Sequence, residues 1–379
     1  MWSVVVALPT LQAEFGVDRG EASLPYTATM VGFAAGGILM GRLLDRFGLR
    51  PLLIFAAAML AGGYLLAAQA TTLWQFMAAQ TLLIGMLGSA VGFAPLVADA
   101  TLWFRRRRGI AVSIVASGNY LAGTVWPPIL QYAIDTVGWR QAHVMVGLFC
   151  LAAMVPLALL LRRRPRTDAD ADATGPGHAG PAPAPLPQGR LQIMLVVAGL
   201  SCCIAMSMPQ VHIVAYCGDL GYGVARGAEM LSLMLGFGIV SRLASGLIAD
   251  RIGGAGTLLL GSTLQCLALF FYLPFDGLTP LYIVSALFGL SQGGIVPSYA
   301  LIVRDHFPAR EAGRRISLVL MMTVVGMAIG GWMSGEIYAH TGSYRAAFLN
   351  GIAFNLLNMS IAFWLLLGRL RARRARVAA

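Results

Sequence analysis

Eleven long runs of mainly apolar residues follow one another along the sequence, and they constrain the fold more than any other feature. A helix needs about 20 such residues to cross the hydrocarbon core of a bilayer. Since the backbone cannot hydrogen-bond to lipid, each run predicts a membrane-spanning helix. The runs are Tyr26–Leu44, Leu52–Ala70, Phe76–Ala98, Ile110–Thr136, Val144–Leu161, Leu191–Tyr216, Met230–Ala249, Leu258–Leu273, Leu281–Val303, Ile316–Ala339 and Ala346–Leu367.

The amino-acid composition indicates the same environment. The 379 residues are 58% hydrophobic and 11% charged, with a mean hydropathy of +0.74, whereas soluble domains carry about 25% charged residues. A soluble fold of this length cannot hide so much apolar surface. The composition therefore excludes a soluble globular protein and predicts an all-α integral membrane protein.

The N-terminal stretch MWSVVVALPTLQAEFG contains a shorter apolar segment. Its apolar part, Met1 to Leu11, covers about 16 Å as a helix, which is roughly half of the hydrocarbon thickness. It has no basic n-region and no A-x-A cleavage site, so it does not fit a signal peptide. We interpret it as the second half of a first transmembrane helix whose beginning is missing, which gives twelve helices with the first one truncated.

The placement of arginine predicts the orientation of the helices. The 27 Lys and Arg residues are all arginine, and most fall on alternate connecting segments. The opposite, arginine-poor side carries only Arg19, Arg140, Arg226 and Arg345. By the positive-inside rule, the arginine-rich side and both termini are cytoplasmic, and we expect a multi-pass protein of a bacterial cytoplasmic membrane. The net charge of +11 is then a topology signal whose partner is membrane lipid, and nucleic acid is not an expected partner.

A polar segment divides the sequence into two halves. Arg162 to Arg190 is rich in Pro, Ala, Gly and Asp, so it cannot bury a core and predicts a flexible cytoplasmic linker. The predicted organisation is an N-terminal helix bundle over 1–161, the linker over 162–190, a C-terminal helix bundle over 191–368 and a basic cytoplasmic tail over 369–379.

The two halves repeat each other in sequence. GRLLDRFG returns as SGLIADRIG, which places Asp45 and Asp250 205 residues apart. GWRQAH returns as GSYRAAF, with Arg140 and Arg345 separated by the same interval. Two six-helix halves in the same orientation predict two bundles related by a pseudo-two-fold axis, which is an architecture of transporters that alternate access.

The sequence carries no motif typical of catalysis or cofactor binding. It has no Cys/His spacing for zinc, no GxxxxGK[ST] phosphate loop and no GxSxG elbow. The five cysteines lie within or beside apolar runs, as small buried residues do. We therefore expect no enzyme activity, no metal and no cofactor.

The loop GRLLDRFGLRP resembles the Gly-x-Leu-x-Asp-Arg-x-Gly-Arg signature between helices 2 and 3 of the major facilitator superfamily. The resemblance implies a gate latch, in which Gly41 lets helices approach closely and Asp45 and Arg46 pair with helix ends. Asp250 and Arg251 repeat the acid and the arginine in the second half. The alternative is a plain cytoplasmic loop with basic residues.

Three further stretches resemble one branch of this superfamily. WFRRRRGIAVSIVASGNYLAG, PQVHIVAYCGDLG and SRLASGLIADRIG are similar in pattern to helices 4–5, 7 and 8 of the monocarboxylate porters and their oxalate/formate-type bacterial relatives. This resemblance implies the twelve-helix major facilitator fold and a small organic anion as substrate.

Arg242 is a permanent charge inside an apolar helix. Eight helical residues place it about 12 Å above Asp250, which marks the cytoplasmic end. A charge at that depth must face a partner or a water-filled cavity, and snorkelling to the headgroups is the alternative. The matching position in helix 2 is Gly37, so the fold does not require an arginine there.

The resemblance to the monocarboxylate porters implies that Arg242 grips the substrate carboxylate. Two departures from that family bear on proton coupling. The porters often have an acidic residue one turn before this arginine, where this chain has Gly238, and some use a lysine, which this chain lacks. Coupling to protons therefore stays an open alternative.

Other polar residues in the predicted helices are candidates for the substrate cavity. His212 in helix 7 can carry a proton or hydrogen-bond an anion. Asn119 and Tyr120 lie among small residues of helix 5, and Gln292 lies in helix 10. For each of them, hydrogen bonding between packed helices is the alternative role.

Pro127 and Pro128 are consecutive prolines in helix 5. They free backbone carbonyls and bend the helix, which suits a gate. A bend that serves helix packing alone is the alternative.

We expect from these features a secondary active transporter that moves a small organic anion, with a monocarboxylate as the first candidate, by alternating access. Protons are the candidate coupling ion. An exporter of apolar or cationic compounds is an alternative of the same class. A non-transporting membrane sensor of the same fold is an alternative of a different class.

Overall fold

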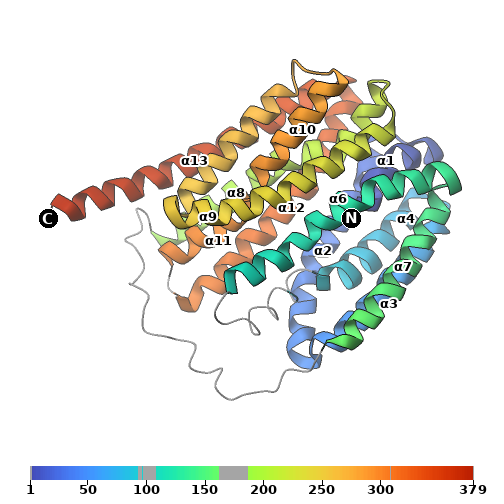
Figure 1. Cartoon of the computed structure of the whole chain (residues 1–379), viewed down its shortest axis with the longest axis horizontal. Helices are drawn as coiled ribbons and strands as arrows, with labels where there is room; N and C mark the ends of the chain where they lie inside the picture. Colours follow the sequence, from blue (N-terminus) through green and yellow to red (C-terminus); the bar gives the residue numbers. More distant parts are fainter. Residues whose placement is uncertain (1, 93–95, 97–107, 162–186, 308, 379) are drawn as a thin grey trace.

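The computed structural model describes residues 2–92, 96, 108–161, 187–307 and 309–378, which form helices joined by short loops (Figure 1). Nine stretches of these residues are long and apolar enough to cross a membrane. The described residues contain no strand. The chain is therefore an all-helical integral membrane protein, as its apolar runs predict.

One predicted span of the N-terminal half does not form a regular α-helix. The run predicted as one helix from Phe76 contains a ten-residue π-helix, in which the hydrogen bonds are one residue longer than in an α-helix. The elements of this half are α1 (Trp2–Phe15), α2 (Arg19–Phe47), α3 (Leu49–Ala68), α4 (Leu73–Ala78), the π-helix η1 (Ala79–Gly88), the 3-10 helix η2 (Ser89–Gly92), α6 (Arg108–Val137) and α7 (Trp139–Leu160).

The C-terminal half begins with α8 at Gln188, three residues before the predicted start. Most of the predicted linker, 162–186, lies outside the described residues. α9 contains two predicted spans joined across Gly253, and the run predicted as helix 10 is divided into α10 and α11. The elements are α8 (Gln188–Asp219), α9 (Val224–Phe271), α10 (Leu278–Gln292), α11 (Ile295–His306), α12 (Ala309–Thr341) and α13 (Tyr344–Ala378).

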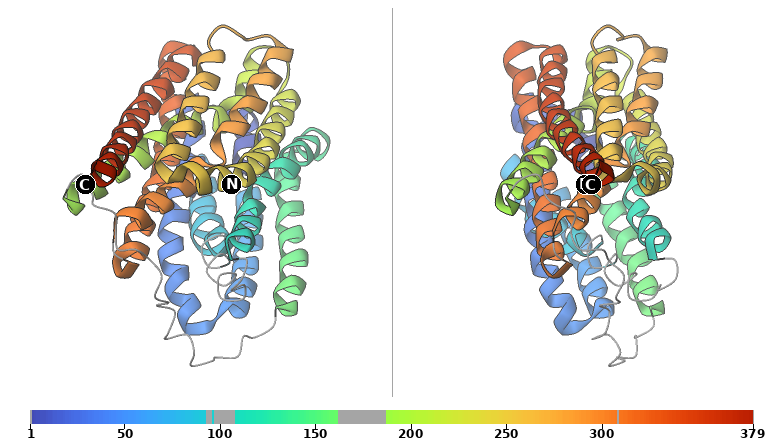
Figure 2. Two further views of the ribbon diagram at one scale, coloured as in Figure 1. Left: turned by 60° about the vertical axis from the view of Figure 1, so that its left-hand side comes forward. Right: turned by 90° about the vertical axis from the view of Figure 1, so that its left-hand side faces the viewer.

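The two halves lie side by side. Figures 1 and 2 show α2, α3, α4 and α7 grouped on one side of the molecule and α8, α9, α10 and α13 on the other, with α13 running out to the C-terminus. Buried apolar residues of both halves, among them Leu8 and Leu235, belong to one continuous cluster. The described helices thus form two bundles that share a packed interface.

The backbone repeats with the spacing that the sequence motifs predict. Gly16 and Gly221, which are separated by the same interval as Asp45 and Asp250, have φ angles of 63° and 82°. Gly48 and Gly253 keep that interval too and have φ angles of 79° and 78°. Positive φ favours glycine, which lacks a Cβ. Equivalent helices of the two halves therefore turn at equivalent positions.

Candidate functional site

The two halves meet where α6 of the N-terminal half crosses α9 of the C-terminal half. The crossing is antiparallel, because Thr124 contacts Ser232 while Tyr120, one turn earlier on α6, contacts Arg242, further along α9. A Cβ on Gly238 would lie only 2.9 Å from Cε1 of Tyr120. A glycine at this position therefore lets the Tyr120 ring pack against α9.

The guanidinium of Arg242 lies over the ring of Tyr120, with 4.3 Å between Cζ and the ring centroid. Tyr120 is buried and Arg242 is half-buried. A cation at this distance is attracted to the negative face of the ring. The arginine thus reaches across to α6 at the interface of the halves, which is not the direction that snorkelling along α9 requires.

Gln292, the last residue of α10, brings an amide to the same place. Glycines seat α10 closely on α9: a Cβ on Gly293 would lie 2.4 Å from the backbone nitrogen of Arg242. The buried Gln292 accepts a hydrogen bond at Oε1 from Nε2 of Gln210 in α8. Its own Nε2 lies 3.4 Å from the Cβ position of Gly238 and has no hydrogen-bond partner in the described residues. Arg242, Tyr120 and Gln292 therefore converge on Gly238.

Two other predicted residues have different surroundings. Asn119 is exposed and precedes Tyr120 on α6. His212 is fully buried between α8, α12 and α13, with Nε2 2.8 Å from the carbonyl oxygen of Gly331 and Nδ1 3.4 Å from the hydroxyl of Tyr344. These contacts are those of a histidine that packs helices together, and a proton-carrying or anion-binding role for His212 stays a prediction.

Pro128 has a visible consequence at the crossing of α6 and α9. A proline at this position has no N–H, so the carbonyl of Thr124, four residues earlier, loses its helical donor. The hydroxyl of Ser232 donates to that carbonyl from the opposite half. Pro127 is buried beside it, and α6 continues through both prolines. The proline pair thus supplies an acceptor for a bond between the halves.

Most of the described polar side chains of the signature loops on the arginine-rich side are exposed. A Cβ on Gly41 would meet no described atom within 4 Å, and the role of this glycine in a gate latch stays a prediction. Arg46 stacks on Phe47, with 5.4 Å from Cζ to the ring centroid. Asp250 and Arg251 are exposed, and the side chain of Asp45 lies outside what the structure describes.

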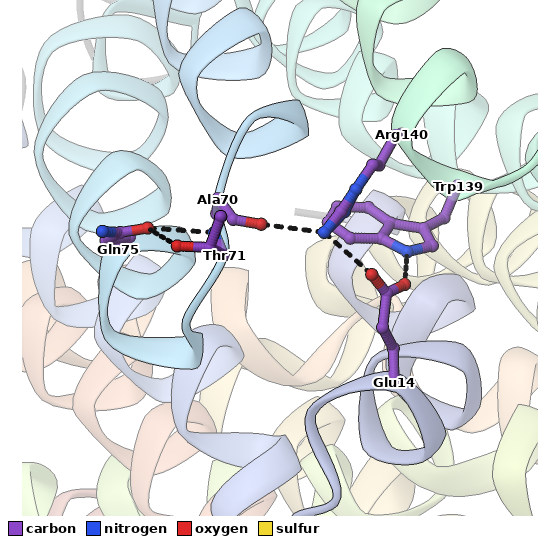
Figure 3. Close-up of polar contacts among 6 residues, drawn as sticks. All are labelled: Glu14, Ala70, Thr71, Gln75, Trp139 and Arg140. Carbon is purple, nitrogen blue, oxygen red and sulfur yellow. Dashed lines mark hydrogen bonds and ion pairs between the residues drawn. The ribbon is translucent and has the colours of Figure 1, made fainter.

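A polar cluster joins three elements of the N-terminal half at the arginine-poor end. Arg140 at the start of α7 lies 2.8 Å from Glu14 at the end of α1 and donates at 2.9 Å to the carbonyl of Ala70. Trp139 Nε1 donates to the same carboxylate. Figure 3 shows the cluster with the neighbouring turn, drawn as Glu14, Ala70, Thr71, Gln75, Trp139 and Arg140.

The arginine-poor end of the interface carries an ion pair between the halves. Arg19, at the start of α2, donates at 3.0 Å to both carboxylate oxygens of Asp219, at the end of α8. The Arg19 side chain is only 7% exposed, and its Cζ lies 5.1 Å from the ring centroid of Tyr338 in α12. A pocket of about 450 Å³ that opens to the surface beside the pair is lined by residues of both halves, among them Gln12 and Ala215. The pair bonds the two halves to each other at this end.

The sequence predicts Arg242, Tyr120 and Gln292 as site residues. It does not predict the residues that surround them or that close the ion pair between the halves. Gln210 was a detectable signal, since it is an amide in an apolar run two residues before His212. Arg19 and Asp219 flank the turns at Gly16 and Gly221, but their wide separation in the sequence gives no sign that they meet.

Comparison with known proteins agrees with this architecture. The family model of the Major Facilitator Superfamily matches residues 1–281 and 255–378. Monocarboxylate transporter 13 of Bos taurus is 29% identical over 318 residues, covering 83% of this chain and 73% of its own length. Agnestins efflux protein AgnL12 of Paecilomyces divaricatus is 22% identical, covering 96% of this chain and 81% of its own length.

The fold has a match among solved structures. The crystal structure of a mutant of the nucleoside transporter NupG superposes with a TM-score of 0.73 at 13% identity, covering 97% of this chain and 96% of that chain. At this identity the likeness concerns the fold alone. The family match extends over almost the whole chain, and the helices, the repeat and the paired bundles agree with it: the chain is a membrane transporter of the Major Facilitator Superfamily.

Proposed function

We propose that this transporter moves a small organic anion, with a monocarboxylate as the first candidate, by alternating access. The observation that carries the proposal is the position of Arg242, a permanent cation held against Tyr120 at the interface of the two halves. A carboxylate bound there would exchange its hydration for a charge-assisted hydrogen bond. The name of the bovine relative is consistent with such a substrate.

The second part of the proposal concerns the surrounding groups. The free amide hydrogens of Gln292 lie on the same side of α9 as Arg242 and would orient a bound anion by hydrogen bonding. Asn119 is proposed to line the approach to the site from the arginine-rich end. Each of these groups is uncharged, so Arg242 would supply the selectivity for anions.

The conformation supports an assignment of the gates. The halves are bonded to each other at the arginine-poor end, through Arg19 and Asp219, whereas the signature loops at the arginine-rich end are exposed. With the arginine-rich side in the cytoplasm of a bacterium, as the positive-inside rule implies, this arrangement would be that of an inward-facing state. Rocking of one half on the other would then open the Arg19–Asp219 end.

An exporter of apolar or cationic compounds is a second candidate, and the name of the relative AgnL12, an efflux protein, is consistent with export. Uptake of labelled small monocarboxylates into proteoliposomes, with and without an inward proton gradient, separates the two. We expect saturable uptake of the acids but not of their neutral amides, and stimulation by the gradient would identify protons as the coupling ion. Absence of acid uptake together with movement of apolar or cationic dyes would replace the proposal by the exporter, and ligand binding without any transport would favour a sensor.

A further inference from the structure

Two acids occupy equivalent places in the repeat. Glu14 lies near the end of α1 and Asp219 at the end of α8, at the same interval as the repeated sequence motifs. Each is followed two residues later by a glycine with positive φ, Gly16 or Gly221. In the N-terminal half, Glu14 pairs with Arg140 of its own half at 2.8 Å. The repeat therefore predicts a partner for Asp219 within its own half.

The C-terminal half contains that partner. Arg345 is the repeat equivalent of Arg140 and lies at the same place in the first turn of its helix, α13. In this structure, however, Asp219 pairs with Arg19 of the opposite half. Arg345 is exposed and makes no ion pair with the residues that the structure describes. In this structure the acid is therefore paired with a different arginine from the one that the repeat predicts.

Of these two acids, only Asp219 has an arginine to pair with in the opposite half. The repeat equivalent of Arg19 is Val224, the first residue of α9, which cannot pair with Glu14 across the interface. Glu14 accordingly stays bonded to Arg140 within its own half. The sequence therefore supplies only Asp219 with an arginine in each half.

Aromatic contacts hold the start of α13, which carries Arg345, against α8, the helix that ends at Asp219. Tyr344, the residue before Arg345, lies 5.2 Å from Tyr216 of α8 and 4.3 Å from Tyr338 of α12, measured between ring centroids. These helices belong to the C-terminal half and would move with Asp219 as one body. Arg19 belongs to the N-terminal half and would move away when this end opens.

We propose that Asp219 exchanges partners during transport, bonding Arg19 while the arginine-poor end is closed and Arg345 when it is open. An acid that loses its only cation in a partly buried place is destabilised. A second arginine in the same half compensates for that loss, so the open state becomes accessible. Arg19, Asp219 and Arg345 are then positioning residues for the gate and do not contact the substrate.

A reporter cysteine at Ala215 tests the exchange. Ala215 is 2% exposed and lines the cavity beside the ion pair, so a cysteine there should react with a membrane-impermeant maleimide only when the arginine-poor end opens. The labelling rate is measured in proteoliposomes, with protein lacking the added cysteine as background. We expect Arg19→Gln to raise the rate about two- to fivefold and Arg345→Gln to lower it by a similar factor, as befits a partly exposed ion pair.

The matched control is Arg140→Gln, which breaks the equivalent pair inside one half and should leave the labelling rate unchanged. In an Asp219→Asn background, Arg345→Gln should not change the labelling rate further, because the carboxylate that Arg345 would bond is absent. A labelling rate for Arg345→Gln equal to that of Arg140→Gln would overturn the exchange, as would a persistent Arg345→Gln effect in the Asp219→Asn background. Labelling needs no substrate, so these outcomes are independent of which anion is carried.

Discussion

The two helix crossings that join the halves, α2 on α12 and α9 on α6, begin alike and end differently. Near the arginine-poor end, Thr27 of α2 donates at 2.9 Å to the carbonyl of Ala328. Ser232 of α9, the repeat equivalent of Thr27, donates to the carbonyl of Thr124. Three turns further along each helix, the two crossings have different residues. α2 has Gly37, where a Cβ would meet nothing within 4 Å, and α9 has Arg242 stacked on Tyr120.

This difference separates architecture from chemistry. The hydroxyl-to-carbonyl bonds recur in both crossings, so they belong to the way in which a repeated fold joins its halves. The arginine occurs on one side only, so the repeated fold does not require it. A cation at the interface on one side of a pseudo-symmetric molecule is the arrangement expected where a single anion binds.

Removing the arginine should give the largest effect. We expect Arg242→Gln to lower carboxylate transport at least about 30-fold, because loss of one partner of a buried charge pair costs about 2 kcal/mol or more. The control is Arg226→Gln, which removes an exposed arginine sixteen residues earlier on the same helix. Uptake into proteoliposomes containing equal amounts of folded protein measures the two variants, and equal rates for both would make Arg242 a structural residue.

Changing the ring beneath the guanidinium should have an intermediate effect. Tyr120→Leu removes the aromatic face and is expected to raise KM about fivefold, whereas Tyr120→Phe keeps the face and should change KM about twofold or less. The concentration dependence of uptake gives both values. If Phe and Leu were equally harmful, the phenol hydroxyl rather than the ring would be the group that matters.

Removing the interface hydroxyl of either crossing should give the smallest change in transport rate. The change should be the same for both crossings. Thr27→Val and Ser232→Ala each remove one hydrogen bond between the halves, worth about 1 kcal/mol. We expect each to change the transport rate by about two- to fivefold while KM for the anion stays constant. A change in KM for Ser232→Ala alone would show that the α9 crossing contributes to the anion site over its whole length.

Much of the fold could be predicted from the sequence because its signals are strong ones. Apolar runs of membrane length identify the spans, and the repeat of Asp45 at Asp250 gives the spacing that the turns at Gly48 and Gly253 share. Arg242 is predicted as a site residue because a charge within an apolar helix must face a partner or a water-filled cavity. The sequence also predicts Tyr120 as a cavity residue, and the structure places its ring against this arginine.

Other features depend on packing between distant segments. The ion pair of Arg19 with Asp219 joins helices of the two halves, and neither residue differs in type from an ordinary helix-end charge. The break between α10 and α11 follows from Gly293, whose N–H bonds to the hydroxyl of Ser241 on α9. Apolar residues continue on both sides of that break, so the predicted helix 10 runs through it.

The most direct test of the central claim is the binding of a small carboxylate and of its uncharged amide to the purified protein and to Arg242→Gln, by titration calorimetry. If Arg242 holds the carboxylate, the purified protein binds the acid in preference to the amide, and the substitution removes that preference. An Arg242→Gln protein that still prefers the acid by the same factor would contradict the claim and place the anion elsewhere in the molecule.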